Sequence, residues 1–127
     1  MPTSIVALLQ ARDRQALADS VSDSVRFHSP VADYEGRRDV THLLSLIADV
    51  LADLRPTREL RTPTSYTTFV EASVNGRPIQ GVLDEHHDAS GRVVEATLML
   101  RPLGALRTAV AAMAEALDDE PLPSRVD

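Results

Sequence analysis

A chain of 127 residues with 43% hydrophobic side chains is long enough to form one domain with its own core. Its net charge is -6 and it has no run of basic residues, so we expect no nucleic-acid-binding surface. The absence of cysteine excludes disulfides and thiolate metal sites. No apolar run reaches the roughly 18 residues of a membrane span. These features predict a cytoplasmic protein that does not bind membranes.

The N-terminal part of the chain predicts two short helices and a short strand. Apolar residues recur at helical spacing after Thr3 and Ser4, and again after Asp13. The polar side chains of Thr3 or Ser4 and of Asp13 can cap the two helices. These apolar residues are Ile5, Leu8, Leu9, Leu17 and Val21. Residues 25–28 then predict a strand that ends before Pro30, and residues 33–36 predict a loop.

The most regular apolar pattern predicts a long amphipathic helix from about Arg38 to Leu54, stopped by Pro56. A second helical stripe near the end of the chain consists of Leu103, Leu106, Val110, Met113 and Leu117. We expect residues 1–117 to form the domain. The acidic, proline-containing segment 118–127 is expected to be disordered, because it has nothing to bury.

Two turn signals between the helices predict three antiparallel strands. The dipeptide Asn75-Gly76 is a strong hairpin signal, because both central residues must adopt positive φ. This turn places Tyr66 opposite Glu85. The polar loop 88–91 is the second turn, and it predicts that Glu85 lies beside Val94 on the next strand.

Alternation along these strands divides their side chains between two faces of the sheet. The inner face is predicted to be apolar and covered by helices. Its apolar members are Val70, Ala72, Val74, Ile79, Leu83, Val94, Ala96, Leu98 and Leu100. The outer face mixes polar residues with Phe69, Val82, Val93 and Met99, a composition that suits solvent or a partner subunit.

Polar residues on the inner face are the first functional candidates. Tyr66 and Glu85 oppose each other there, with Thr68 adjacent. Burial raises the pKa of a carboxyl group, and a neighbouring phenol can donate a hydrogen bond to it or to a ligand. The pair is therefore a candidate for acid–base chemistry. The alternative is that both residues lie at the rim of the sheet, where the glutamate reaches water.

The order of the predicted elements implies an α+β fold in which helices cover a curved antiparallel sheet. Several segments, in this order, resemble the nuclear-transport-factor-2-like (NTF2-like) superfamily, which includes SnoaL-like polyketide cyclases, ketosteroid isomerases and limonene epoxide hydrolases. The resemblance covers about residues 3–117 and rests on segments 12–17, 25–30, 36–40, 81–83, 90–95 and 100–106. The last of these is similar to the ending of an uncharacterised bacterial branch.

The resemblance implies a cone-shaped, cystatin-like fold, with the curved sheet wrapped around the long helix and an apolar pocket between them. It implies that the pocket is lined by the inner sheet face, the helix stripe and residues 27–34. The ligand-binding candidates are Phe27, Tyr34, Thr68, Leu83 and Leu98. The isomerases of this superfamily carry a catalytic aspartate just before the proline of the short-strand motif. Ser29 stands at that position, so this resemblance does not predict isomerase chemistry of that kind.

Two functions are compatible with these features. The first is binding of a small, largely apolar molecule, extended to cyclase, isomerase or hydrolase chemistry if His28, Tyr66 and Glu85 act as catalytic groups. His28 could equally be a satisfied histidine at the pocket wall. The alternative is a non-catalytic interaction module. In either case, we expect a homodimer formed through the outer sheet face.

No cofactor or metal site is expected. The adjacent histidines His86 and His87 resemble part of a metal site, but successive residues of a strand point to opposite faces. They therefore cannot easily bind the same ion.

Overall fold

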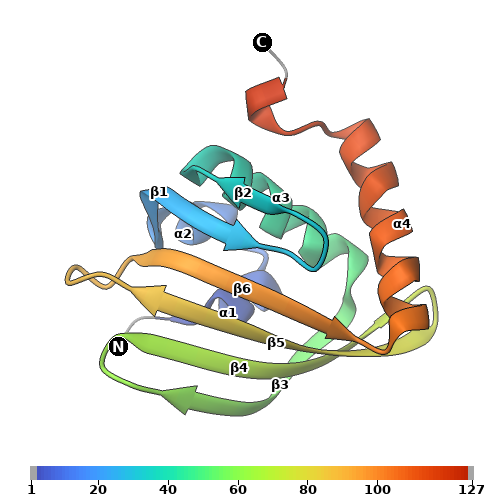
Figure 1. Cartoon of the computed structure of the whole chain (residues 1–127), viewed down its shortest axis with the longest axis horizontal. Coiled ribbons are helices and arrows are strands. Elements are labelled where there is room, and N and C mark those ends of the chain that lie inside the picture. Colours follow the sequence, from blue (N-terminus) through green and yellow to red (C-terminus); the bar gives the residue numbers. More distant parts are fainter. Residues whose placement is uncertain (1–2, 126–127) are drawn as a thin grey trace.

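The computed structural model describes residues 3–125, in which helices cover one face of a curved six-stranded sheet (Figure 1). The strands are β1 (Val21–His28), β2 (Asp33–Glu35), β3 (Ala52–Arg61), β4 (Ser65–Val74), β5 (Arg77–His87) and β6 (Val93–Arg101). The helices are α1 (Ile5–Ala11), α2 (Arg14–Asp19), α3 (Arg37–Val50) and α4 (Leu103–Asp119), and a 3-10 turn follows at Pro123–Arg125. None of the described helices is long and apolar enough to cross a membrane.

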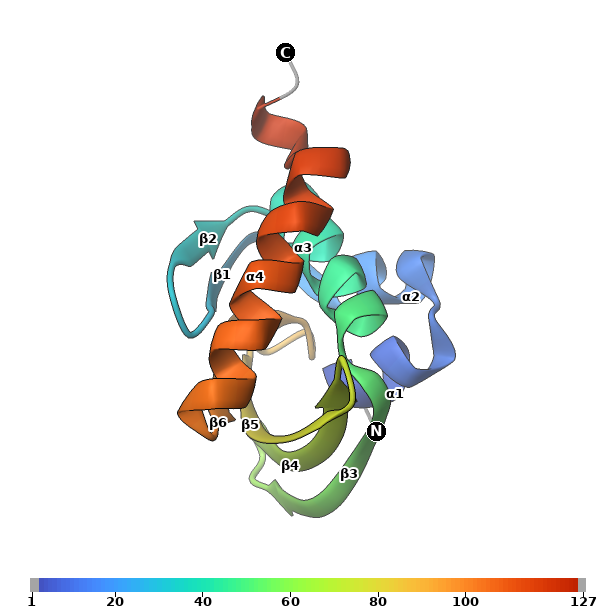
Figure 2. The same ribbon diagram turned by 90° about the vertical axis from the view of Figure 1, so that its right-hand side faces the viewer.

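The sheet has the strand order β2-β1-β6-β5-β4-β3. All neighbouring strands are antiparallel except β1 and β6, which run parallel. Figure 2 shows β3, β4 and β5 curving beneath α3 and α4, which lie on the concave side of the sheet. The predicted α+β architecture, a curved sheet around a long helix, is confirmed.

The two N-terminal helices begin at the caps that the sequence predicts. The Ser4 side chain accepts a hydrogen bond from the Ala7 backbone at 3.1 Å, and Asp13 accepts one from the Ala16 backbone at 3.0 Å. Each cap satisfies a backbone N–H that has no partner within the helix. Arg12 adopts a left-handed conformation with φ 53°, which ends α1 and lets the chain turn into α2.

The β4–β5 hairpin has the predicted register. Asn75 and Gly76 both have positive φ, at 48° and 79°, as a two-residue turn of this kind requires. Val74 consequently pairs with Arg77 and, further along the strands, Tyr66 pairs with Glu85. Both Tyr66 and Glu85 lie on the inner face, and both are buried.

The pairing of β5 with β6 is shifted by two residues from the prediction, because Glu85 lies opposite Ala96 and not Val94. A β-bulge in this pair places Val93 opposite His87 and leaves Val94 as the extra residue. The bulge directs Val93 to the inner face, where it is 2% exposed. The prediction that Val93 belongs to the outer face is therefore wrong.

The long helix α3 ends at Val50, not at Leu54 as predicted. Leu51 has an extended backbone, and β3 begins at Ala52. Leu51 and Leu54 nevertheless pack on the same core as α3, which explains why their spacing suggested a longer helix. The sequence pattern missed β3, because this strand is polar and contains Pro56; an edge strand tolerates both features.

Two smaller differences concern the start of the sheet. β1 begins at Val21, four residues before the predicted strand, and residues 33–35 form β2 where a loop was expected. β2 pairs antiparallel with the end of β1, so that Tyr34 lies opposite Phe27.

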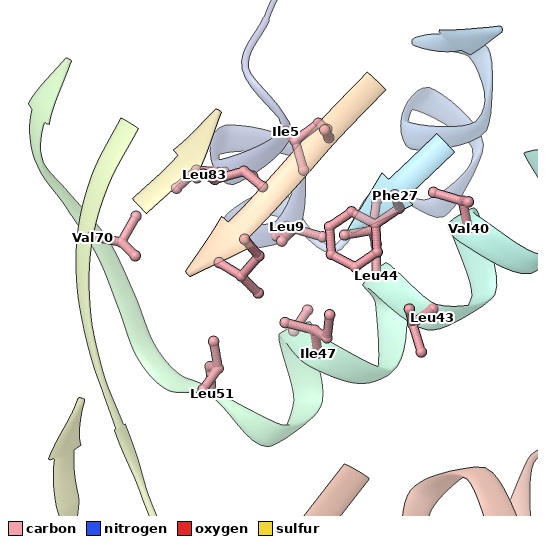
Figure 3. Packing of buried hydrophobic residues seen from close by; sticks show 14 of the residues in the cluster. Ile5, Leu9, Phe27, Val40, Leu43, Leu44, Ile47, Leu51, Val70 and Leu83 are labelled. Atoms are coloured by element: carbon pink, nitrogen blue, oxygen red, sulfur yellow. The ribbon is translucent and has the colours of Figure 1, made fainter. Parts of the chain in front are cut away.

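The core lies between α3 and the inner sheet face. Figure 3 shows Leu44 of α3 beside Phe27 of β1, with Leu83 of β5 and Ile5 of α1 on the same cluster. Phe27 is fully buried, Leu44 is 1% exposed and Leu83 is 2% exposed. The helix stripe predicted from the sequence thus packs on the predicted sheet face.

The C-terminal segment is anchored in the structure. Leu122 is 6% exposed and belongs to the core. The backbone N–H and the hydroxyl of Ser124 donate hydrogen bonds to the carboxylate of Asp39, at 3.0 and 2.6 Å. The expectation that segment 118–127 has nothing to bury is therefore wrong for Leu122, because an isolated leucine carries no periodic signal. Residues 126–127 lie outside the described part of the chain.

Candidate functional site

An apolar cavity of about 180 Å³ lies between α3, α4, the C-terminal part of β6 and the β1–β2 connection. Its walls are formed by Ser29, Pro30, Val31, Tyr34, Leu43, Ile47, Val50, Leu51, Leu98, Leu100, Leu106, Ala109, Val110, Met113, Ala114 and Leu117. Val31 is 63% exposed and Val110 is 36% exposed, so these residues mark the side that opens to solvent.

The wall formed by α4 was not predicted. The sequence indicated an apolar stripe on this helix but did not say which surface it faces. In the structure, α4 follows β6 directly and packs beside α3, so the stripe from Leu106 to Leu117 faces the cavity. The only sequence signal for this wall was the stripe itself, since an apolar helix face needs a partner surface.

Among the cavity walls, only Ser29 and Tyr34 have polar side chains. The Ser29 hydroxyl donates to the Ala32 carbonyl at 2.9 Å and accepts from the backbone N–H groups of Ala32 and Val31, at 3.0 and 3.3 Å. Ser29 therefore stabilises its own turn. No side chain that carries a charge at neutral pH is among these walls.

Glu85 occupies a different place, under α1. It is fully buried, and its Oε2 atom accepts a hydrogen bond from the Ile5 backbone at 3.0 Å. Its Oε1 atom has no hydrogen-bond partner among the described residues. Burial raises the pKa of Glu85 to about 7, and the nearby Asp84 raises it as well. The hydrogen bond from Ile5 and the charge of Arg61 act in the opposite direction.

The predicted partnership between Tyr66 and Glu85 is only partly present. The two residues are paired across the strands, but the Tyr66 hydroxyl donates to Oε2 of Glu59 at 2.7 Å. The Arg61 guanidinium lies over the Tyr66 ring, 4.0 Å from its centre. Tyr66 is thus held by β3, a strand that the sequence pattern did not predict.

A histidine that the sequence pattern did not pair with Glu85 lies beside it. His87 Nε2 lies 3.5 Å from Glu85 Oε1, because residues two apart on a strand share a face. Burial lowers the pKa of His87, against a raising effect from its hydrogen bond to the Thr64 backbone. His86 points the other way and bonds Asp84 at 2.9 Å, as the alternation predicts.

His28 lies on the outer face and not at the cavity. Its Nδ1 atom is 2.8 Å from an Asp33 carboxylate oxygen and its Nε2 atom is 2.7 Å from Glu95 Oε2. The hydrogen bonds to Glu95 and Asp33 raise the pKa of His28. His28 therefore links β1 to β2 and β6 through its contacts with two carboxylates, and it does not line the cavity.

Of the eight residues proposed from the sequence, Tyr34 and Leu98 line the cavity. The other six do not: Phe27, His28, Tyr66, Thr68, Leu83 and Glu85. Thr68 and Leu83 lie in the buried part of the sheet, and the Thr68 hydroxyl has no hydrogen-bond partner among the described residues. Strand alternation predicted the correct face of the sheet for Glu85. Its position along β5, however, places Glu85 beneath α1 and not at the cavity.

The sequence matches no protein-family model and no curated protein. The structure is similar to a steroid delta-isomerase from Pseudomonas aeruginosa (25% identity, 92% of this chain and 94% of that chain, TM-score 0.84). It is also similar to an uncharacterised protein with a cystatin-like fold from Silicibacter pomeroyi (17% identity, 91% and 84% coverage, TM-score 0.87). A third similar structure is an NTF2-like protein of unknown function from Cytophaga hutchinsonii (12% identity, 80% and 88% coverage, TM-score 0.67).

These similarities, together with the strand order and the covering helices, define an α+β protein of the cystatin-like fold class. The chain therefore has the fold that NTF2-like proteins share, as the order of its predicted elements suggested.

Proposed function

We propose that this protein binds a small, neutral, largely apolar molecule in the cavity between α3 and α4. The observation that carries the proposal is the composition of the walls, which are aliphatic except for Ser29 and Tyr34. A charged ligand would lose its hydration there without gaining a partner of opposite charge. An apolar ligand, in contrast, would gain contacts with the walls and leave water.

The size of the cavity limits the ligand. A volume of about 180 Å³ is close to the roughly 150 Å³ of an apolar cavity that holds benzene. It is smaller than the roughly 300–1,000 Å³ of sites for drug-sized ligands. We therefore propose a ligand of about one six-membered ring. A steroid, the substrate class named for the Pseudomonas isomerase, has four fused rings and is larger than this volume.

Binding is better supported than turnover. Cyclase, isomerase and hydrolase reactions generally need a base or acid that reaches the ligand. Ser29, at the position where isomerases of this superfamily carry an aspartate, has its hydroxyl engaged in a turn. Glu85 is sealed beneath α1. Neither residue supplies such a group to the cavity.

The test uses cyclohexane and two alanine positions on α4. Ala114 and Ala111 are both exposed, but only Ala114 is among the cavity walls. We expect cyclohexane to shift the methyl NMR signals of Leu98 and Met113 in the wild type and in Ala111→Trp. In Ala114→Trp, the indole should block the cavity and abolish these shifts. The proposal is wrong if cyclohexane does not bind the wild type, or binds both variants equally.

A second proposal concerns assembly, and a different observation favours it. Phe69, Val82 and Met99 are paired across β4, β5 and β6, so they form a continuous apolar row on the outer face. Met99 is 65% exposed, which is costly for a large apolar side chain in water. We propose that a second copy of the chain covers this row, so that the protein is a homodimer with a cavity in each subunit.

A further inference from the structure

Tyr34 is held on the inner side of the sheet by its strand pairing. It lies directly opposite Phe27 in the antiparallel β1–β2 pair, and directly opposed residues share a face. Phe27 is fully buried in the core, so this face is the inner one. The Tyr34 side chain packs against the core and forms part of the cavity wall.

The hydroxyl of Tyr34 has no hydrogen-bond partner among residues 3–125. The other tyrosine of the chain differs in this respect, because the Tyr66 hydroxyl donates to Glu59 at 2.7 Å. The second polar wall residue, Ser29, already donates to the Ala32 carbonyl. Of the two polar wall residues, Tyr34 is therefore the one whose hydroxyl does not already donate a hydrogen bond to the protein.

A single donor in an apolar wall restricts where a ligand can carry a polar atom. An oxygen placed against the aliphatic walls would lose hydrogen bonds to water and gain none. The same oxygen placed at Tyr34 would exchange water for the phenol. The phenol would thus favour ligands that carry an acceptor oxygen, and it would orient that oxygen towards Tyr34.

We propose that the ligand carries one uncharged, hydrogen-bond-accepting oxygen, as in a small cyclic ketone, and that the Tyr34 hydroxyl binds it. Tyr34 is then the residue that selects oxygen-bearing ligands over hydrocarbons of the same shape. This inference rests on the proposed function, because it concerns a molecule bound in the same cavity.

The experiment compares cyclohexane with cyclohexanone, which share a ring but differ by one acceptor oxygen. Dissociation constants of both are measured by NMR titration for the wild type, Tyr34→Phe and Tyr66→Phe. The matched control, Tyr66→Phe, removes a hydroxyl that lies outside the cavity walls. Thermal unfolding of each variant shows that the fold is retained. The Tyr34 ring signals of the wild type provide a second readout.

We expect Tyr34→Phe to weaken cyclohexanone binding about two- to tenfold, the usual effect of losing one hydrogen bond. Cyclohexane binding should not change, and Tyr66→Phe should change neither constant. Cyclohexanone should also shift the Tyr34 ring signals more than cyclohexane does. If both ligands bind and Tyr34→Phe leaves their affinity ratio unchanged, the inference fails while the proposed function stands. If neither ligand binds the wild type, both fail.

Discussion

The Glu85 carboxylate on β5 accepts a hydrogen bond at 3.0 Å from the backbone N–H of Ile5, the first residue of α1 and 80 positions away in the chain. This contact joins the N-terminal helix to the centre of the sheet. Glu85 is also fully buried, and burial raises its pKa. A residue that alternation marks as a catalytic candidate is thus a structural link whose charge affects folding.

Stability should depend on pH through Glu85. Its pKa is raised from 4.5 to about 7 in the folded protein, so the folded state holds the proton more tightly than the unfolded state. The stabilising contribution is complete below pH 4.5 and is lost as the pH rises through 7. At about 1.4 kcal/mol for each pH unit, the loss amounts to about 3 kcal/mol. Denaturant unfolding at several pH values between about 4 and about 8 measures this loss.

Glu85→Gln tests the same idea, because the amide oxygen can still accept from Ile5 but the side chain does not titrate. We expect the free energy of unfolding of this variant to depend less on pH than that of the wild type. Above pH 7, the free energy of unfolding of the variant should be the higher of the two. Glu71→Gln, which changes a carboxylate with 39% exposure, should keep the wild-type profile. A Glu85→Gln protein with the wild-type slope would contradict the assignment.

Two glycine-to-alanine changes should have opposite effects. A Cβ atom at Gly81 of β5 would lie 2.7 Å from both Leu100 Cδ2 and the Met99 carbonyl oxygen, so Gly81→Ala should cost about 1–3 kcal/mol. At Gly104 of α4 the nearest atom is 3.5 Å away, and alanine there should stabilise by up to about 1 kcal/mol. Thermal unfolding of both variants checks the sign of each effect.

Leu122→Ala should destabilise the domain by about 2 kcal/mol, the lower end for burial of a leucine, since a position near the chain end can relax. Leu122 is 6% exposed, whereas Leu103 is 61% exposed. Leu103→Ala is therefore the control and should change the free energy of unfolding by less than about 0.5 kcal/mol. Equal effects of the two changes would mean that the C-terminal segment does not pack as described.

Met99→Asp should convert the proposed dimer to a monomer, because it places a charge in the apolar row formed with Phe69 and Val82. Leu103→Asp introduces the same charge on α4, away from the outer sheet face, and should leave assembly unchanged. Light scattering at high micromolar concentration measures the mass. A monomeric wild type at that concentration would exclude the dimer.

Local chemistry explains which features could be predicted from the residues alone. Asn75-Gly76 imposes a two-residue turn, and alternation then places Tyr66 and Glu85 together on the inner face. Ser4 and Asp13 cap their helices through bonds to backbone groups three residues away. In each case the interacting groups are close in the chain or linked by a fixed strand period, so the pattern is visible in the residues themselves.

The remaining features depend on contacts between elements that are distant in the sequence. Three such features leave no periodic pattern in the sequence. They are the bulge that turns Val93 inward, the edge strand that holds Tyr66, and the burial of Leu122. The cavity exists because α4 packs beside α3, and this packing brings Leu98 and Tyr34 to one space while Glu85 lies beneath α1. Side-chain periodicity determines a face, but only the packing of one element on another determines what that face contacts.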